Sequence, residues 1–249
     1  EWGNIADWSM GLLCPSDWKA QWIGNREDIF PDSTLTFPAP YFRKEFVVAK
    51  PIKKAMAYVC GLGFYEMYFN GERVGEQVLA PAVTNYDRRS LKKLLYHYDD
   101  QSTQRVFYNV FDVTGNLKMQ NNAIGIILGN GWYNQRDRTV EGHMWYDVPK
   151  MILQLEIEYE DGTKEMIVSD NSWKTTTGPL LHDAIFTGEI YDARKDLGRW
   201  NRESYDDNIW ESALQVRPPT GTLMSQTIPF NKVMQIVDTH FEQLNDSLY

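Results

Sequence analysis

Apolar and polar residues alternate along several stretches of this chain, whereas few stretches repeat apolar residues at the spacing of a helix. The clearest alternation covers residues 151–160, where the odd positions are apolar and the even positions from Gln154 onward are polar or acidic. Because successive side chains of a strand point to opposite faces, this pattern predicts a strand in a sheet with one face in water. Residues 164–168 are its predicted return strand, after a two-residue turn at Asp161-Gly162.

Strand patterns dominate the rest of the chain as well. Residues 123–128, AIGIIL, are apolar on both faces, as expected of a central strand that is packed from two sides. A second tight hairpin is predicted at Asn70-Gly71. Further strands are predicted at 41–48, 54–60, 64–69 and 105–113. Many strands separated by Gly, Asn and Asp predict an all-β fold, an antiparallel jelly-roll β-sandwich.

The two ends of the chain differ from its middle in composition. Residues 1–38 are rich in Trp and Pro and show no sustained alternation, which predicts a strap or linker that crosses a neighbouring surface. Residues 39–216 contain the predicted sandwich. Residues 217–249 begin with a linker containing Pro and Gly and then start a new strand, which predicts the beginning of a following β domain.

A short motif in which Asp or Asn precedes Trp recurs three times, at 16–22, 169–176 and 205–213. The Asp or Asn side chain can accept hydrogen bonds from nearby backbone N–H groups while the Trp folds back onto the sheet. We therefore interpret the three copies as structural corners.

Charge and composition exclude some classes of partner. The chain carries 25 Lys and Arg against 34 Asp and Glu, a net charge of −9 that repels phosphate backbones and anionic membranes. No apolar run reaches the roughly 20 residues of a membrane-spanning helix. We therefore predict neither nucleic acid nor a membrane as partner. Cys14 and Cys60 lack the spacing of a metal or redox motif, and we expect both to be buried free thiols.

Aromatic residues make up 14% of the chain and include nine Trp, which suits either stacking on sugar rings or packing in a large β core. The densest candidate group is LGNGWYNQRD, residues 128–137, which follows the predicted central strand. Its side chains offer a stacking platform beside amides and a carboxylate, the parts of a sugar site: Trp132, Tyr133, Asn134 and Asp137. The alternative is a packing corner with a local salt bridge.

A second candidate stretch is TNYDRR, residues 84–89. Its Asn85, Tyr86 and Asp87 would join the rim of the same sugar site. The alternative is a turn that is held by the Asn and Asp side chains.

The third stretch is GEIYDARKDLGRW, residues 188–200. Glu189 and Asp192 would serve as acid and base of a glycosidase if they lay about 5–9 Å apart. The alternation of acids with arginines favours a simpler interpretation, ion pairs that tie a final strand to the strap. We therefore expect no catalytic residue in this chain.

Five stretches, in this order, resemble the N-terminal region of bacterial α-L-rhamnosidases of glycoside hydrolase family 78: MGLLCPSDWKAQWIG, APYFRKEF, GLGFYEMYFNGERVGEQVLAP, NAIGIILGNGWYN and GEIYDARKDLGRW. The resemblance covers nearly the whole chain. It implies a parent enzyme that is an inverting hydrolase of terminal α-L-rhamnose, built from β-sandwich domains and a catalytic helical barrel. The barrel has no counterpart in this sequence, so the resemblance implies a non-catalytic accessory sandwich that braces the rest of the enzyme.

The resemblance also implies an alternative role in sugar binding. Some members use a similar sandwich as a calcium-dependent rhamnose-binding module, with ligands in loops that resemble TNYD and GNGWYN. The corresponding weak calcium candidates are Asn85 and Asn134. Because Asn85 is neutral where many relatives carry Asp, we expect calcium to be absent or loosely held. The expected ligand is L-rhamnose or a rhamnosylated glycan, and the expected location is the periplasm or the outside of a bacterium, with the cytoplasm left open.

In such enzymes the strap crosses the surface of the sandwich. On the predicted strand at 64–69, Phe64, Glu66 and Tyr68 share one face. We expect this face to pack against Trp18 or Trp22 of the strap.

Overall fold

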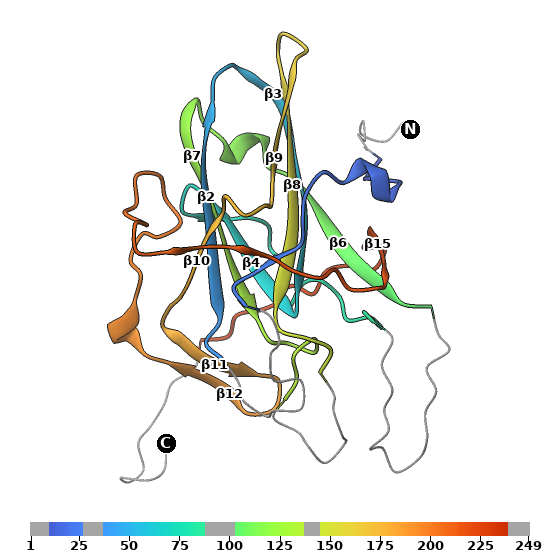
Figure 1. Ribbon diagram of the computed structural model, residues 1–249, viewed down its shortest axis with the longest axis vertical. Coiled ribbons are helices and arrows are strands. Elements are labelled where there is room, and N and C mark those ends of the chain that lie inside the picture. Colours follow the sequence, from blue (N-terminus) through green and yellow to red (C-terminus); the bar gives the residue numbers. More distant parts are fainter. Residues whose placement is uncertain (1–9, 27–36, 88–102, 137–144, 239–249) are drawn as a thin grey trace.

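The computed structural model describes residues 10–26, 37–87, 103–136 and 145–238, which form two packed sheets and a separate hairpin (Figure 1). The larger sheet has the order β14 (Leu214–Gln215), β1 (Ile23–Gly24), β8 (Lys150–Tyr159), β3 (Ile52–Leu62), β6 (Arg105–Asp112), β15 (Thr222–Ser225), and β9 (Lys164–Val168) pairs with β8. The smaller sheet has the order β13 (Glu211–Ser212), β10 (Lys174–Thr177), β2 (Pro40–Val48), β7 (Gln120–Gly129), β4 (Phe64–Phe69), β5 (Glu72–Arg73). The hairpin joins β11 (Leu180–Ala184) to β12 (Gly188–Tyr191). This arrangement confirms the predicted β-sandwich.

The helical segments among the described residues are three single 3₁₀ turns: η1 (Pro15–Asp17), η2 (Thr114–Asn116) and η3 (Ala193–Lys195). None of them has the length or the apolar character of a membrane span. The predicted strands at 41–48, 54–60, 64–69, 105–113 and 123–128 correspond to β2, β3, β4, β6 and β7, within three residues at each end.

The main core lies between the two sheets. The odd positions of β8 point into it, and Met151, Leu153 and Leu155 have no exposed surface. They meet apolar side chains of the smaller sheet, among them Met67 and Ile126. Period-two alternation therefore identified the inward face of this strand correctly.

The outward face of β8 is covered in part, which the sequence pattern did not predict. Gln154 is fully buried, because its Oε1 accepts a hydrogen bond from Lys19 N at 2.7 Å and its Nε2 donates to Asp17 O at 3.1 Å. Both partners belong to the N-terminal strap. Trp18 of the strap also packs edge-to-face on Tyr108 of β6, with ring centroids 5.3 Å apart. A second apolar cluster thus forms on this side of the larger sheet, under the strap.

The predicted hairpins differ in their loops. Phe69 pairs with Glu72, so the loop at Asn70-Gly71 has two residues, as predicted. Between β8 and β9, Tyr159 N donates to Thr163 O at 2.9 Å, which leaves a loop of three residues, 160–162, instead of two. The Asp161 carboxylate accepts from Thr163 N at 2.9 Å and stabilises this wider loop.

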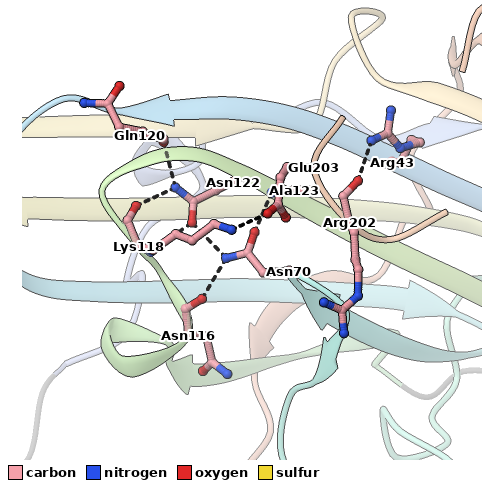
Figure 2. A network of polar contacts seen from close by, with 9 residues as sticks. All are labelled: Arg43, Asn70, Asn116, Lys118, Gln120, Asn122, Ala123, Arg202 and Glu203. Carbon is pink, nitrogen blue, oxygen red and sulfur yellow. Dashed lines mark hydrogen bonds and ion pairs between the residues drawn. The ribbon is translucent and has the colours of Figure 1, made fainter. Parts of the chain in front are cut away.

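A network of polar contacts fixes the Asn70 turn (Figure 2). The Asn70 amide nitrogen donates to Asn116 O at 2.9 Å and to Asn122 Oδ1 at 2.8 Å, and its oxygen accepts from Ala123 N at 2.9 Å. Asn122 is fully buried, and its own amide donates to Lys118 O at 2.7 Å. The start of β7 and the end of β4 are therefore held in register by side chains as well as by the ladder.

The face of β4 that carries Phe64, Glu66 and Tyr68 does not pack against Trp18 or Trp22, so that expectation was wrong. Tyr68 packs edge-to-face on Trp200, with ring centroids 5.9 Å apart. Trp200, Tyr41 and Trp210 form a third cluster on the outer face of the smaller sheet. Trp18 and Trp22, the described tryptophans of the strap, pack instead on the larger sheet.

Both flanking segments contribute strands to the larger sheet. Within the predicted strap, β1 pairs with β8 and with β14, and within the predicted linker, β15 pairs with β6 in parallel. Both cysteines are free, but only Cys60 is buried. Cys14 is exposed because it lies just before η1 on the outer side of the strap, which corrects the expectation of two buried thiols.

The three Asp-Trp motifs lie at corners, as predicted. Trp173 is fully buried and donates its indole N–H to Val168 O at 2.8 Å, and its backbone N donates to Asp170 O. Trp210 N donates to Asp207 O at 3.0 Å in the same way. Asp17 differs in direction, because its carboxylate accepts from the preceding backbone N of Cys14 at 2.9 Å.

Candidate functional site

The loop after β7 is built around buried amides. Asn134 is 2% exposed, and its Nδ2 donates to Asn130 Oδ1 at 2.6 Å. Its Oδ1 accepts from Arg136 Nε at 2.6 Å, and the Arg136 guanidinium lies 4.9 Å from the centre of the Trp145 ring. The predicted sugar-binding amide of Asn134 is therefore engaged inside the loop. Asp137 lies outside the described residues.

Three tyrosines pack together beside this loop. Tyr86 and Tyr133 are buried, and the Tyr86 ring lies edge-to-face on Tyr133 and on Tyr146, with centroids 5.3 Å away in both cases. Tyr133 and Tyr146 are stacked at 5.8 Å. Burial raises the pKa of both Tyr86 and Tyr133, so their phenols stay neutral. The structure thus brings the two predicted tyrosines together in one buried cluster. Their ring faces are covered by neighbouring rings and are unavailable for stacking on a ligand.

Asn85 and Asp87 lie on either side of Tyr86 and face different partners. The Asn85 side-chain oxygen accepts from Tyr146 Oη at 3.1 Å. Asp87 accepts from the Thr220 hydroxyl and lies 3.6 Å from the Arg217 guanidinium. Asn85 therefore joins the tyrosine cluster, whereas Asp87 holds the segment that leads to β15.

Trp132 is directed toward the β11–β12 hairpin. Its ring is partly exposed and lies edge-to-face on Phe186, with centroids 5.6 Å apart. Phe186 is itself 46% exposed. Of the predicted stacking residues, Trp132 is the one that reaches solvent in the described part of the chain.

The calcium candidates Asn85 and Asn134 both carry neutral side chains. Among the described residues, no set of three or more His, Cys, Asp and Glu side chains is placed to hold a metal ion. Asn85 and Asn134 supply one neutral oxygen each, and both oxygens already accept a hydrogen bond. Calcium prefers several charged oxygen ligands, so these two residues alone fit it poorly.

The GEIYDAR stretch separates its carboxylates. Asp192 caps η3, and its carboxylate accepts from Arg194 Nε and from Arg194 Nη2, each at 2.8 Å. Arg194 is largely exposed and the pair is local, so the expected ion pairs with the strap are wrong for these residues. Glu189 instead lines a cavity of about 340 Å³. Glu189 and Asp192 therefore do not face each other across one site, as an acid and base would.

That cavity is lined by residues of β4 and of the β11–β12 hairpin, among others. The hairpin lies at one end of the sandwich (Figure 1). The cavity is lined by three carboxylates and several aromatic rings. Sequence analysis had singled out Glu66 and Glu189 but missed Asp183, which follows LLH with no recognisable motif. Among its wall residues are Tyr41, Phe64, Glu66, Asp183, Glu189 and Tyr191.

Asp183 is held by the loop after β7. Its Oδ1 accepts from Asn130 N at 2.6 Å and its Oδ2 accepts from Asn130 Nδ2 at 3.0 Å. Burial raises the pKa of the Asp183 carboxyl despite these bonds, and the opposing Glu189 raises it further. Asn130 thus links two parts of the protein, the loop that carries Trp132 and the wall of the cavity that carries Asp183.

Comparison with known proteins places this chain in a family. The model of the α-L-rhamnosidase N-terminal domain matches residues 50–235. An α-L-rhamnosidase of Formosa agariphila is 34% identical in an alignment of length 256. The alignment covers 94% of this chain and 25% of that protein. These matches define the class as an N-terminal β-sandwich region of a glycoside hydrolase. The chain belongs to the α-L-rhamnosidase N-terminal domain family.

Solved structures agree with this assignment. The α-L-rhamnosidase from Dictyoglumus thermophilum superposes with a TM-score of 0.72 at 42% identity, covering 88% of this chain and 23% of that one. The Streptomyces avermitilis α-L-rhamnosidase, solved in complex with L-rhamnose, gives a TM-score of 0.70 at 30% identity, covering 81% and 18%. Three curated relatives match this chain along most of its length, and the chain spans about a quarter of the length of each of them.

Proposed function

We propose that this chain is the non-catalytic accessory sandwich of an α-L-rhamnosidase, and that the remainder of the parent protein hydrolyses terminal α-L-rhamnose. The observation that carries the proposal is that the chain spans only about a quarter of its rhamnosidase relatives. The separation of Glu189 from Asp192 supports it, because it leaves that stretch without a facing acid and base.

The test is an assay of the purified chain on an aryl α-L-rhamnoside. No turnover is expected from the chain alone, and hydrolysis is expected from the full-length parent. Hydrolysis by the chain that survives repurification and is lost in a Glu189→Gln variant would overturn the proposal. Trace activity that is unchanged in that variant would identify a contaminating enzyme and leave the proposal standing.

A bracing role is supported by the segment that follows β15. It is attached to the sandwich, because Lys232 bridges to Gln77 and Val78 N donates to Asn231 O at 2.9 Å. Beyond that bridge, large apolar side chains are exposed: Val233 at 62%, Met234 at 90% and Ile236 at 85%. Exposed apolar side chains this close together in the chain are typical of a surface that another domain covers.

The bracing role is tested in the full-length parent. Met234→Ser with Ile236→Ser should lower the thermal midpoint of the enzyme while leaving KM for an aryl rhamnoside unchanged. Ile209→Ser is the control, because that side chain is 92% exposed and lies in a corner on the smaller-sheet side. An unchanged midpoint in the double variant would contradict the bracing role.

L-Rhamnose binding beside Trp132 is the second candidate function. Trp132 offers a partly exposed ring, and the neighbouring Gln135 side chain is 2% exposed with no hydrogen-bond partner among the described residues. Buried amides without partners are rare and point to a bound water or ligand. Stacking with a few hydrogen bonds corresponds to millimolar affinity, about −4 kcal/mol.

The rhamnose test is a calorimetric or NMR titration with L-rhamnose, first with calcium and then with a chelator. We expect weak L-rhamnose binding that shifts the amides next to Trp132, does not change when the chelator is added, and is lost at those amides in Trp132→Ala. Tight binding that the chelator abolishes would make the domain a calcium-dependent module. No binding at about 50 mM would leave Trp132 as a packing residue.

A further inference from the structure

The cavity beside β4 is lined by residues of five strands, β2, β4, β7, β11 and β12. Phe64 and Glu66 contribute from β4, and Tyr41 from β2 closes one side. Glu189 and Tyr191 contribute from β12, where residues two apart share a face. Its volume of about 340 Å³ lies at the lower end of the range of small-molecule sites, which suits one or two sugar rings.

Each carboxylate of the cavity has a different environment. Glu66 is anchored by Tyr68 Oη at 2.5 Å and by Arg73 Nε at 3.3 Å, both from its own sheet. Asp183 is buried against Asn130 and opposes Glu189 in the hairpin register. The carboxylates thus come from opposite walls, and those of Glu66 and Asp183 are held by neighbouring groups before any ligand arrives.

These carboxylates are too dispersed to form a cation site. Among the described residues, no group of three acidic, His or Cys side chains converges closely enough to hold a metal ion. Dispersed acceptors around an open space instead match hydroxyl groups that project from several positions of a ring. The aromatic walls supply flat apolar surface for the C–H faces of the same ring.

We propose that this cavity binds a neutral pyranose unit of a carbohydrate. Glu66 and Glu189 accept hydrogen bonds from ring hydroxyls on opposite sides, while Tyr191 and Phe64 contact the apolar faces. Negatively charged sugars are excluded, because a uronate would be brought beside the carboxylates of Glu66 and Glu189. The site differs from that around Asn85 and the buried tyrosines, because none of those residues lines it.

The choice of rhamnose as one probe rests on the proposed function. The proposal that the cavity binds a pyranose rests only on its lining residues. The probes are methyl α-L-rhamnoside, methyl β-D-galactoside and methyl α-D-glucoside, with D-glucuronate as the anionic comparator. Binding of a galactoside or glucoside without the rhamnoside would support the cavity and count against rhamnose recognition. The two proposals can therefore fail separately.

The experiment is an amide NMR titration of the 249-residue chain. At least one neutral glycoside should shift the amides of Gly129, Leu180 and Glu189 with millimolar affinity, and glucuronate at neutral pH should shift them less. Tyr191→Ala and Glu189→Gln should each weaken binding about tenfold.

Ile190→Ala is the matched control for Tyr191→Ala. The two side chains are equally exposed, at 58% and 59%, but Ile190 points away from the cavity on the same strand. Binding in Ile190→Ala should be unchanged. Amide spectra of the free variants show whether each one retains the fold.

Three outcomes would overturn the proposal. These are no amide shifts with any neutral glycoside at about 50 mM, equal losses in Ile190→Ala and Tyr191→Ala, and stronger binding of glucuronate than of the neutral probes. Methylguanidinium is added as a last arm. If methylguanidinium shifts the cavity amides and the glycosides do not, the cavity is a binding site for a basic side chain.

Discussion

The Arg43 guanidinium in β2 donates its Nε hydrogen to the backbone oxygen of Trp200 at 2.9 Å, across 157 positions of the chain. Its Nη2 donates to Arg202 O at 3.0 Å (Figure 2), and Nη1 forms an ion pair with Asp207. The Arg43 side chain is 1% exposed. One buried cation therefore fastens the segment around Trp200 to the outer face of the smaller sheet.

Replacing this cation should be among the most destabilising changes in the protein. Arg43→Met keeps most of the side-chain volume but leaves the two carbonyls and Asp207 without their donor, and loss of one partner of a buried pair typically costs about 3–5 kcal/mol. The free energy of unfolding is measured by urea titration with tryptophan fluorescence. Lys44→Met is the control, because Lys44 Nζ donates to Ser172 Oγ in a solvent-exposed contact, and it should change stability by less than about 1 kcal/mol.

The two hairpin glycines should differ in their sensitivity to alanine. Gly71 and Gly162 both have positive φ, +88° and +80°, so alanine at either costs about 1–2 kcal/mol of backbone strain. A Cβ at Gly71 would in addition lie 2.5 Å from Arg202 Nε, whereas Gly162 has open space around it. The midpoint of thermal unfolding should therefore be lower for Gly71→Ala than for Gly162→Ala. Gly115→Ala, with open space and no positive φ, should be nearly neutral, and an equal loss at all three positions would contradict this account.

These hairpins also show how far the sequence predicted the fold. Alternation located β8 and β9, because inward positions such as Leu153 and Leu155 must be apolar. It did not reveal that Gln154 is buried, because its partners lie more than 130 positions away in the strap. The loop length at Asp161 depended on a hydrogen bond to Thr163 that the Asp-Gly pair alone does not specify.

The buried Asp183 should make stability depend on pH in a defined direction. Its pKa is raised above the ordinary value of about 3.9, first by burial and then by Glu189, while Asn130 and His182 partly oppose the shift. The folded state therefore holds this proton more tightly than the unfolded state. Its contribution to stability is present below the ordinary pKa and is lost as pH rises through the raised pKa.

The measurement compares wild type with Asp183→Asn by urea unfolding between about pH 3.5 and 7. Other carboxylates, such as Asp112, whose pKa is lowered by Thr114, act in the opposite direction in both proteins and cancel in the difference. Relative to wild type, the variant should gain stability as pH rises through this window. Parallel stability curves would show that Asp183 titrates alike in the folded and unfolded chains.

The two thiols should react at very different rates. Cys14 is exposed, whereas Cys60 is buried and its pKa is raised by burial, which suppresses the reactive thiolate. An aromatic disulfide reagent should therefore modify one thiol per chain under native conditions and two in denaturant. Cys14→Ser should abolish the native reaction. Rapid native modification of that variant would show that Cys60 is accessible.

The candidate site was predictable only in part. The sequence placed Trp132 at a strand end correctly, because a buried strand followed by glycines must turn there. It did not separate Trp132 from Tyr133, whose burial depends on Tyr86 and on Tyr146, residues distant in sequence. Nor did it assemble the cavity, whose acids Glu66 and Asp183 are brought together only by the docking of the hairpin at β4.

The parallel pairing of β15 with β6 has a mechanical consequence. Thr222 to Ser225 lie beside Arg105 to Tyr108 and run in the same direction, in a fold whose other strand pairs are antiparallel wherever it is described. A pull along β15 on the chain beyond Ser225 loads all the hydrogen bonds of this pair together, in shear, instead of opening them one after another. Force from that side is thus passed directly into the larger sheet, and β15 acts as its anchor.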